Sequence, residues 1–293
     1  MTATTTSTVD LAELIRVQTP EGGLRHDLRA VRVVWQREMI RFTRDRLRII
    51  TSLIQPVLFL FVLGTGLSTI TNGAARNVNF RTFMYPGALS MAVLFTAMFS
   101  AASIVWDREF GFLREMLVAP VSRWSIVVGK CFGGATTAAL QGVIILAFAG
   151  LVGVPYSLSL MLIVFGELLL LAFTLTAFGV MTAARIQQFQ SFMALNQMLL
   201  MPLFFLSGAL FPLNNLPSWL RVLTRVDPLT YAVDPIRRAV FAHLDVPGPV
   251  LARLNPGLTW GSWRVPTALE LRIVATMGIA MLAVAIWQFR SAD

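Results

Sequence analysis

Six stretches of this 293-residue sequence are long and apolar enough to cross a lipid bilayer as α-helices. The hydrocarbon core of a bilayer is about 30 Å thick, so a helical crossing needs roughly 20 apolar residues. Hydrophobic residues make up 56% of the chain and charged residues 13%, which leaves too few polar groups to cover a soluble globule. The sequence predicts an all-α integral membrane protein with six transmembrane helices. The expected spans are residues 49–70, 84–106, 126–153, 158–183, 193–211 and 268–289.

The net charge of +9 comes almost wholly from arginine, which is concentrated just before the first span. The positive-inside rule places that segment in the cytoplasm, and six crossings return the C-terminus to the same side. The long fifth connection departs from the rule, and its arginines are expected to snorkel towards lipid headgroups or water. They include Arg221, Arg225, Arg237 and Arg238. Two short amphipathic pieces in this connection are predicted to be re-entrant or interfacial helices on the outer side.

Two segments precede the first span. Residues 1–24 are polar, and we expect a disordered cytoplasmic tail. Residues 25–48 place apolar side chains, among them Trp35, Met39 and Phe42, at helical spacing with most arginines on other faces. The pattern predicts an amphipathic helix on the cytoplasmic interface, with its apolar stripe in the acyl boundary. Anchorage alone and an added contact with a partner both remain open.

The connection after the second span is short and densely charged, unlike the other short connections. Residues 107–119 are predicted to form a helix that Pro120 ends. Phe110, Leu113 and Leu117 fall on one side, where they could rest on lipid or fill a groove in another protein. Glu109, Arg114 and Glu115 could pair with charges around such a groove.

Several residues inside the spans allow two interpretations. Pro56 is expected to bend the first helix, and Gly129, Gly133 and Gly134 supply small-residue spacing for close helix contacts. Glu167 is an acid within an apolar run, so it either bonds a neighbouring helix, for example through Gln141, or lines a substrate path. The bulky group Phe204, Phe205 and Leu206 is either ordinary packing or an apolar gate.

The reacting groups of a membrane enzyme are not found in the sequence. His26 and His243 are the only histidines, and Cys131 is the only cysteine. The run WSIVVGKC has Trp124 and Cys131 where a GxxxxGK[ST] phosphate loop needs glycine and a hydroxyl. We expect no catalytic residues, no metal and no cofactor on this chain, so energy for any pumping must come from elsewhere.

Three segments, taken in order, resemble the membrane subunit of type 2 ATP-binding-cassette (ABC) exporters, especially the bacterial drug-resistance and nodulation-factor permease branch. They are DREFGFLREMLVAPVSR, PLFFLSGALFP and LPSWLRVLTRVDPLTYAVDPIRR. The resemblance implies that 25–48 is a connecting helix and 107–119 a coupling helix, which a cytoplasmic ATPase carrying ATP and Mg²⁺ would move. It also implies a pair of permease chains in the bacterial inner membrane, with no nucleic acid among the partners.

The resemblance further implies export of a hydrophobic drug-like or lipid-linked substrate. A polysaccharide or glycolipid permease is the alternative within the same class. A membrane scaffold or sensor that holds a cytoplasmic partner without moving cargo is the alternative from another class.

Overall fold

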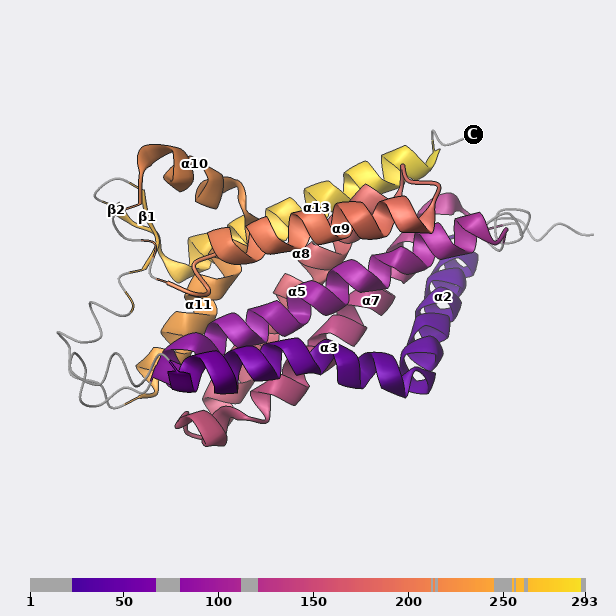
Figure 1. Ribbon diagram of the computed structural model, residues 1–293. Helices are drawn as coiled ribbons and strands as arrows, with labels where there is room; N and C mark the ends of the chain where they lie inside the picture. Colours follow the sequence, from indigo (N-terminus) through magenta and orange to yellow (C-terminus); the bar gives the residue numbers. More distant parts are fainter. Residues whose placement is uncertain are drawn as a thin grey trace, which may run out of the picture.

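The computed structural model describes residues 23–66, 80–111, 121–211, 213, 216–244, 255, 257–260 and 263–290. The expected tail therefore lies almost wholly outside the described residues, as does most of the expected coupling helix. The described chain is mostly helical (Figure 1). A small antiparallel hairpin is the departure from an all-α fold, and it pairs β1 (Thr259–Trp260) with β2 (Trp263–Arg264).

Six helical segments of the described chain overlap the six expected spans. They are α3 (Arg46–Leu58) continued by the π-helix η1 (Phe59–Leu63), α5 (Phe80–Glu109), α7 (Arg123–Leu146), α8 (Leu158–Ala183), α9 (Phe189–Leu206) and α13 (Thr267–Arg290). The segment Arg46–Gly66 and the helices α5, α8, α9 and α13 are long and apolar enough to cross a membrane. Helix α7 is not one of these five, although its 24 residues extend about 36 Å.

We name the two ends of the bundle after the helices that cover them, the α2 end and the α11 end. Helix α2 (Leu24–Arg44) lies steeply across the bundle, and the last turn of α13 reaches the same end (Figure 1). At this end the guanidinium of Arg123, the first residue of α7, donates to the Arg290 carbonyl at 3.2 Å. The start of α7 and the last turn of α13 therefore lie side by side.

Helix α5 is the centre of the bundle. It is buried along most of its length and packs against α3, α7, α8, α9 and α11. Tyr85 donates to the carbonyl oxygen of Leu146 at 2.8 Å, which satisfies one of the free carbonyls at the end of α7. The predicted spans near 84–106 and 158–183 correspond closely to α5 and α8.

Helix α7 is rich in glycine, and these glycines allow its neighbours to approach closely. A Cβ added at Gly129 would lie 2.8 Å from Cβ of Val34, and one at Gly133 would lie 2.7 Å from Cβ of Glu38. A Cβ at Gly134 would meet the Ser100 side chain of α5. The close helix contacts predicted for these glycines are present, and they hold α2 and α5 against one helix.

Helix α2 corrects one expectation from the sequence. Its apolar stripe was predicted to lie in lipid, but Val34 is buried against Gly129 of α7. The indole of Trp35 donates to Oγ1 of Thr136 at 3.1 Å. The glycine face of α7 offers a groove within the same chain. The spacing of apolar residues along α2 is the same whether they face such a groove or lipid, so the sequence alone could not tell the two apart. The α2 helix also ends earlier than predicted, at Arg44, and Asp45 caps α3 by accepting the amide hydrogen of Arg48.

Pro56 was predicted to bend the first helix, and the helix changes type shortly after this residue. Proline has no amide hydrogen, so an α-helical bond is lost there. The π-helix η1 begins three residues later at Phe59.

Helix α7 ends before its predicted limit, and a 3-10 turn η2 (Ala149–Val152) follows it. Helix α9 ends at Leu206 because Gly208 adopts a left-handed conformation, φ 73°.

The two short helices expected between the fifth and sixth spans are present as α10 (Ser218–Val226) and α11 (Pro228–Ala242). Helix α11 is largely buried in protein rather than lying on the surface. Arg237, predicted to snorkel outwards, is instead buried and donates to the carbonyl oxygens of Gly208 at 2.5 Å and Ala209 at 3.3 Å. The left-handed turn after α9 leaves these carbonyls without helical partners, and Arg237 supplies them.

Arg238 likewise points into protein. Its guanidinium pairs with Asp234 and with Glu270 of α13 at 3.1 Å, and donates to the Val265 carbonyl at 2.9 Å. Asp234 also accepts the amide hydrogen of Leu258 at 3.1 Å. The α11 end is thus closed by a helix whose charged groups all bond within the chain.

Candidate functional site

A buried charge network lies at the α2 end, where α5 runs into the charged connection. It consists of Glu38, Ser103, Asp107 and Lys130, with Arg37 at its edge. The Lys130 ammonium lies 2.5 Å from Oδ2 of Asp107 and 2.7 Å from Oε1 of Glu38. It also donates to Oγ of Ser103 at 3.1 Å. One cation therefore joins α2, α5 and α7.

The members of this network are almost fully enclosed. The side chains of Lys130 and Asp107 are 2% and 1% exposed, whereas the Arg37 side chain is 40% exposed. Arg37 reaches the second carboxylate oxygen of Asp107 at 2.7 Å. Burying separate charges is costly, and removing one partner of a buried pair typically costs about 3–5 kcal/mol. Any movement of α5 relative to α2 and α7 that breaks these ion pairs therefore has a high free-energy cost.

The two residues after Asp107 hold the turn between α8 and α9. Arg108 donates to the carbonyl oxygens of Ala184 at 2.9 Å and Ile186 at 2.8 Å. These carbonyls follow the end of α8, where helical partners run out. The carboxylate of Glu109 accepts the amide hydrogen of Phe189 at 2.8 Å, at the first turn of α9. A carboxylate at a helix N-terminus is favourable.

The returning stem of the connection is held by other helices. The amide of Ser122 donates to Oδ1 of Asp27 in α2 at 3.1 Å. Arg123 begins α7 and reaches the last carbonyls of α13. The stems of loop 107–122 thus contact α2, α7, α8, α9 and α13, so a displacement of this loop would be felt by most of the bundle.

The predicted coupling residues are only partly within the described chain. Leu113, Arg114, Glu115 and Leu117 lie outside it. Glu109 is the last residue of α5 rather than part of a new helix, because α5 continues through Asp107 and ends where Gly111 takes φ 83°. The predicted start of a separate helix at residue 107 is therefore wrong. Phe110 is 58% exposed, and its ring centroid lies 4.7 Å from that of Trp106.

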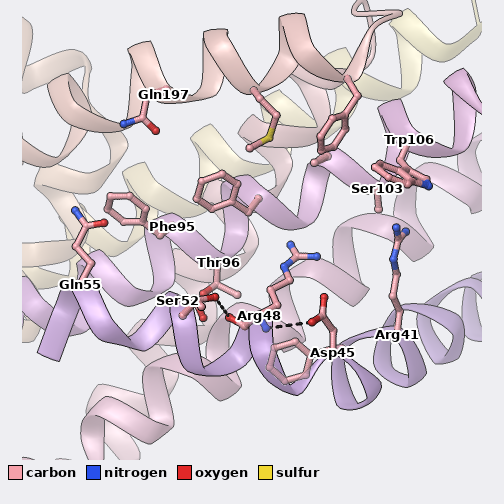
Figure 2. Close-up of a pocket in the computed structure, with 16 residues that line it drawn as sticks. Arg41, Asp45, Arg48, Ser52, Gln55, Phe95, Thr96, Ser103, Trp106 and Gln197 are labelled. Atoms are coloured by element: carbon pink, nitrogen blue, oxygen red, sulfur yellow. Dashed lines mark hydrogen bonds between the residues drawn. The ribbon is translucent and has the colours of Figure 1, made fainter.

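A cavity of about 570 Å³ adjoins the network, between the elbow of α2 and α3, helix α5 and helix α9 (Figure 2). Arg41 and Arg48 line one part, and Gln55 and Gln197 lie at the opposite end (Figure 2). Aromatic side chains form much of the wall between them. They are Phe42, Phe95, Phe99, Trp106 and Phe189. The cavity combines aromatic walls with a few charged and polar groups, a combination typical of sites for organic molecules.

The other predicted path and connecting-helix residues lie in different places. Phe204 is buried, and its ring meets that of Phe59 edge-on at 5.4 Å, whereas Phe205 is 51% exposed. Leu206 is partly buried at the end of α9. None of these three lines the cavity. Of the connecting-helix residues, Phe42 lines it, Trp35 bonds α7, and Met39 is partly buried.

Glu167 is buried in α8 and does not line the cavity either. Its Oε2 atom has no hydrogen-bond partner within the described part of the chain. The suggested bond to Gln141 does not form, because the Gln141 amide donates instead to the Ile49 carbonyl and to Oγ of Ser52 in α3. Glu167 is therefore a buried polar group that lies outside this cavity.

Comparison with known proteins gives this arrangement a family. Residues 29–241 match the family described as ABC-2 type transporter, a match over more than half of the sequence. The chain belongs to the ABC-2 type transporter family. The match begins within α2 and ends within α11, so it includes both bundle ends and the loop stems between them.

Several relatives of this ABC-2 chain carry transport names. It is 33% identical to a putative transport permease ycf38 of Cyanophora paradoxa, over 70% of this chain and 72% of the relative. It is 28% identical to nodulation protein J of Rhizobium leguminosarum bv. trifolii, over 72% of this chain and 80% of the relative. It is 29% identical to the probable multidrug ABC transporter permease YbhR of Escherichia coli, over 60% of this chain and 49% of the relative. The chain is accordingly a transmembrane permease subunit of an ABC transporter.

Sequence reasoning missed the charge network as a unit. Neither Glu38 nor Lys130 was singled out by the sequence patterns considered above. One usable signal was present: Lys130 lies between Gly129 and Gly133, on a helix already expected to make close contacts. A lysine in such a position needs a carboxylate from a neighbouring helix.

Proposed function

We propose that this ABC-2 chain is the transmembrane subunit of an ATP-driven exporter, and that loop 107–122 docks on a separate cytoplasmic ATPase. The α2 end would then face the cytoplasm, in keeping with its arginines. ATP and Mg²⁺ would bind the partner, and this chain would supply no catalytic residue. The membrane would be the bacterial inner membrane, with both termini cytoplasmic.

The observation that carries the proposal is the way the loop stems are connected. Asp107 joins α2 and α7, Arg108 and Glu109 hold the α8–α9 turn, and the returning stem reaches α2 and α13. A loop that only rested on lipid would not need bonds to five helices. A loop that the ATPase displaces does need them, because its displacement must be transmitted to the helices that line the substrate path.

The substrate would be a hydrophobic drug-like or lipid-linked molecule, and multidrug efflux with antibiotic resistance is the corresponding cellular role. The aromatic wall of the cavity and the printed name of the multidrug relative support this class. Two permease chains would pair in the membrane, as identical or different subunits. The segment Arg46–Gly66 and α9 have large uncovered apolar faces that such pairing could use.

The docking of loop 107–122 can be tested with Phe110, which is exposed at its start. Replacing Phe110 and Leu113 with Asp should abolish co-purification of the ATPase, because charged groups would replace the apolar side that fills its groove. The measurement is co-purification with the neighbouring cassette protein, followed by ATPase activity in lipid nanodiscs.

Trp263→Asp is a matched control, since Trp263 is a half-exposed aromatic residue in the hairpin at the opposite end. It should leave assembly intact. Full assembly and ATP-driven transport by the Phe110→Asp, Leu113→Asp variant would contradict the proposal.

A gate at Phe204, Phe205 and Leu206 is a further part of the proposed transport cycle. Its support is the contact between Phe204 and Phe59, which joins the first and fifth long helices. Alanine at all three positions should raise substrate leak in proteoliposomes by widening an apolar constriction. Unchanged transport and unchanged leak would remove the gate from the mechanism.

A further inference from the structure

The cavity beside the buried charge network has an unequal distribution of charge. Arg41 and Arg48 line it, and no carboxylate lies within 4 Å of either guanidinium in the described residues. Asp45 is the one acid in its lining, and Oδ1 of Asp45 accepts the Arg48 amide hydrogen at 3.1 Å. Both guanidinium groups reach into the space under α9 (Figure 2). Two arginines in a cavity with one acid leave a net positive end.

The positive end continues into a second hollow. A groove of about 580 Å³ shares Arg41, Asp45 and Trp106 with the cavity and adds Arg37 and Arg44. Asp107, the other acid in this groove, is already held by Arg37 and Lys130. Across the two hollows four arginines face two aspartates, so the route into the cavity is basic throughout.

The opposite part of the cavity suits an uncharged body. Phe95 and Phe99 lie on α5 between the arginine end and the amides of Gln55 and Gln197. Thr96 also lines this part of the cavity.

We infer that this cavity binds an amphiphile with an anionic head group, the head between Arg41 and Arg48 and the apolar body along Phe95 and Phe99. Guanidinium groups bind sulfate, phosphate and carboxylate oxygens with charge-assisted hydrogen bonds, and flat aromatic walls suit an alkyl or ring body. The inference rests on the proposed function only in naming the amphiphile as cargo. A bilayer lipid with an acidic head group has the same chemistry, and the experiment must separate the two.

The test uses Trp106 as the reporter. The full-length permease is placed in phosphatidylcholine nanodiscs without any ATPase, and tryptophan emission is titrated with dodecyl sulfate brominated at its second carbon. Bromine quenches only a nearby indole, and the Trp106→Phe variant defines the part of the signal that belongs to Trp106. The same titration with a dodecyl trimethylammonium probe of matched bromination measures the preference for negative charge.

Saturable quenching of Trp106 by the sulfate probe is expected, with an apparent Kd at least about tenfold lower than for the ammonium probe. Changing Arg41 and Arg48 together to Gln should raise the sulfate Kd by about tenfold or more. Lysine at both positions should keep the preference for sulfate, because the charge remains. If the Gln variant does not fold, the Lys variant and the two wild-type titrations still test whether the cavity prefers an anionic head group.

Arg32→Gln is the matched control, because Arg32 is exposed on the same helix and lines neither hollow. Equal quenching by both probes, or an equal loss of affinity in Arg32→Gln, would overturn the inference. Adding phosphatidylglycerol to the discs distinguishes the sources. Strong competition identifies a lipid in this anionic site, and undiminished binding identifies a cargo. A failure of the ATPase to associate would overturn the proposed function and leave this binding result unaffected.

Discussion

The two ends of the bundle both bury charged groups, yet they use them differently. At the α11 end, Arg237 bonds the backbone carbonyls of Gly208 and Ala209, and Arg238 combines the Val265 carbonyl with the carboxylates of Asp234 and Glu270. At the α2 end, Lys130 bonds only side chains, among them the carboxylates of Glu38 and Asp107, which belong to two other helices. The carbonyl bonds of Arg237 fix the path of one chain segment, whereas the side-chain pairs of Lys130 join three helices at one point.

This difference suggests a division of labour in the proposed exporter. The α11 end acts as a rigid closure, because its arginines hold the turn after α9 in place. The α2 end acts as a joint, because buried side-chain pairs join its helices next to a cavity and to loop 107–122. The following three variants test that division, in order of expected effect.

Lys130→Met should cause the largest loss of stability. It removes the shared cation and leaves Glu38 and Asp107 as buried carboxylates close to one another. Breaking a buried pair in this way costs about 3–5 kcal/mol. Thermal unfolding of the purified protein in a neutral detergent should show a clear fall in Tm.

Two companion variants sharpen this result. Adding Glu38→Gln to Lys130→Met should restore part of the lost stability, because the uncompensated charge of Glu38 is removed while Asp107 keeps its pair with Arg37. Arg37→Met should cost no more than about 1 kcal/mol, since its side chain is 40% exposed to solvent. An Arg37→Met loss as large as that of Lys130→Met would mean that the network is not centred on the lysine.

Arg237→Met should have the next largest effect. Burial lowers the pKa of Arg237 to about 10, so the side chain stays charged near neutral pH and its carbonyl bonds are charge-assisted. Its loss leaves the carbonyls of Gly208 and Ala209 without this donor, at a cost of roughly 2–3 kcal/mol. Hydrogen exchange should increase in the turn after α9.

The matched control for that variant is Arg221→Met in α10. Arg221 is exposed and donates to the Leu216 carbonyl at 3.1 Å. Its replacement should leave the unfolding temperature nearly unchanged. If Arg237→Met also leaves exchange in the turn unchanged, the α11 end is not held by this arginine and the contrast between the two ends fails.

Gly129→Ala should have the smallest effect of the three. The added Cβ would lie 2.8 Å from Cβ of Val34 and 3.0 Å from the Val31 carbonyl oxygen, so α2 must shift away from α7. Overpacking of this kind costs roughly 1–2 kcal/mol. Gly166→Ala is the control, because a Cβ there meets nothing within 4 Å, and it should be neutral or slightly stabilising. Equal melting temperatures for the two variants would show that α2 is not closely docked.

The helical architecture was largely predictable from the sequence, because apolar length and periodicity report on membrane crossing directly. The predicted span 158–183 coincides with α8. Boundaries at turns were less predictable: residue 107 was expected to begin a helix, but α5 runs on to Glu109 and Gly111 ends it. A charged run looks the same whether it ends one helix or starts another.

The sequence did not predict which charged residues pair with one another in the fold. Glu38 and Lys130 are 92 positions apart, and nothing in either local pattern specifies the other. Arg237 was expected to point outwards because its neighbours in sequence are amphipathic, whereas its direction is set by the left-handed turn at Gly208. Both errors arise from contacts between distant segments, which periodicity within one segment does not contain.

Lys130 is the sole lysine of the 293-residue sequence, and its side chain is 2% exposed, with its amine between two carboxylates. An amine-acylating reagent therefore has one side-chain target in the chain, and that target is shielded while the network is closed. Acylation of Lys130 would therefore report the opening of the charge network. The extent of acylation at residue 130 over time would record how often the three helices separate.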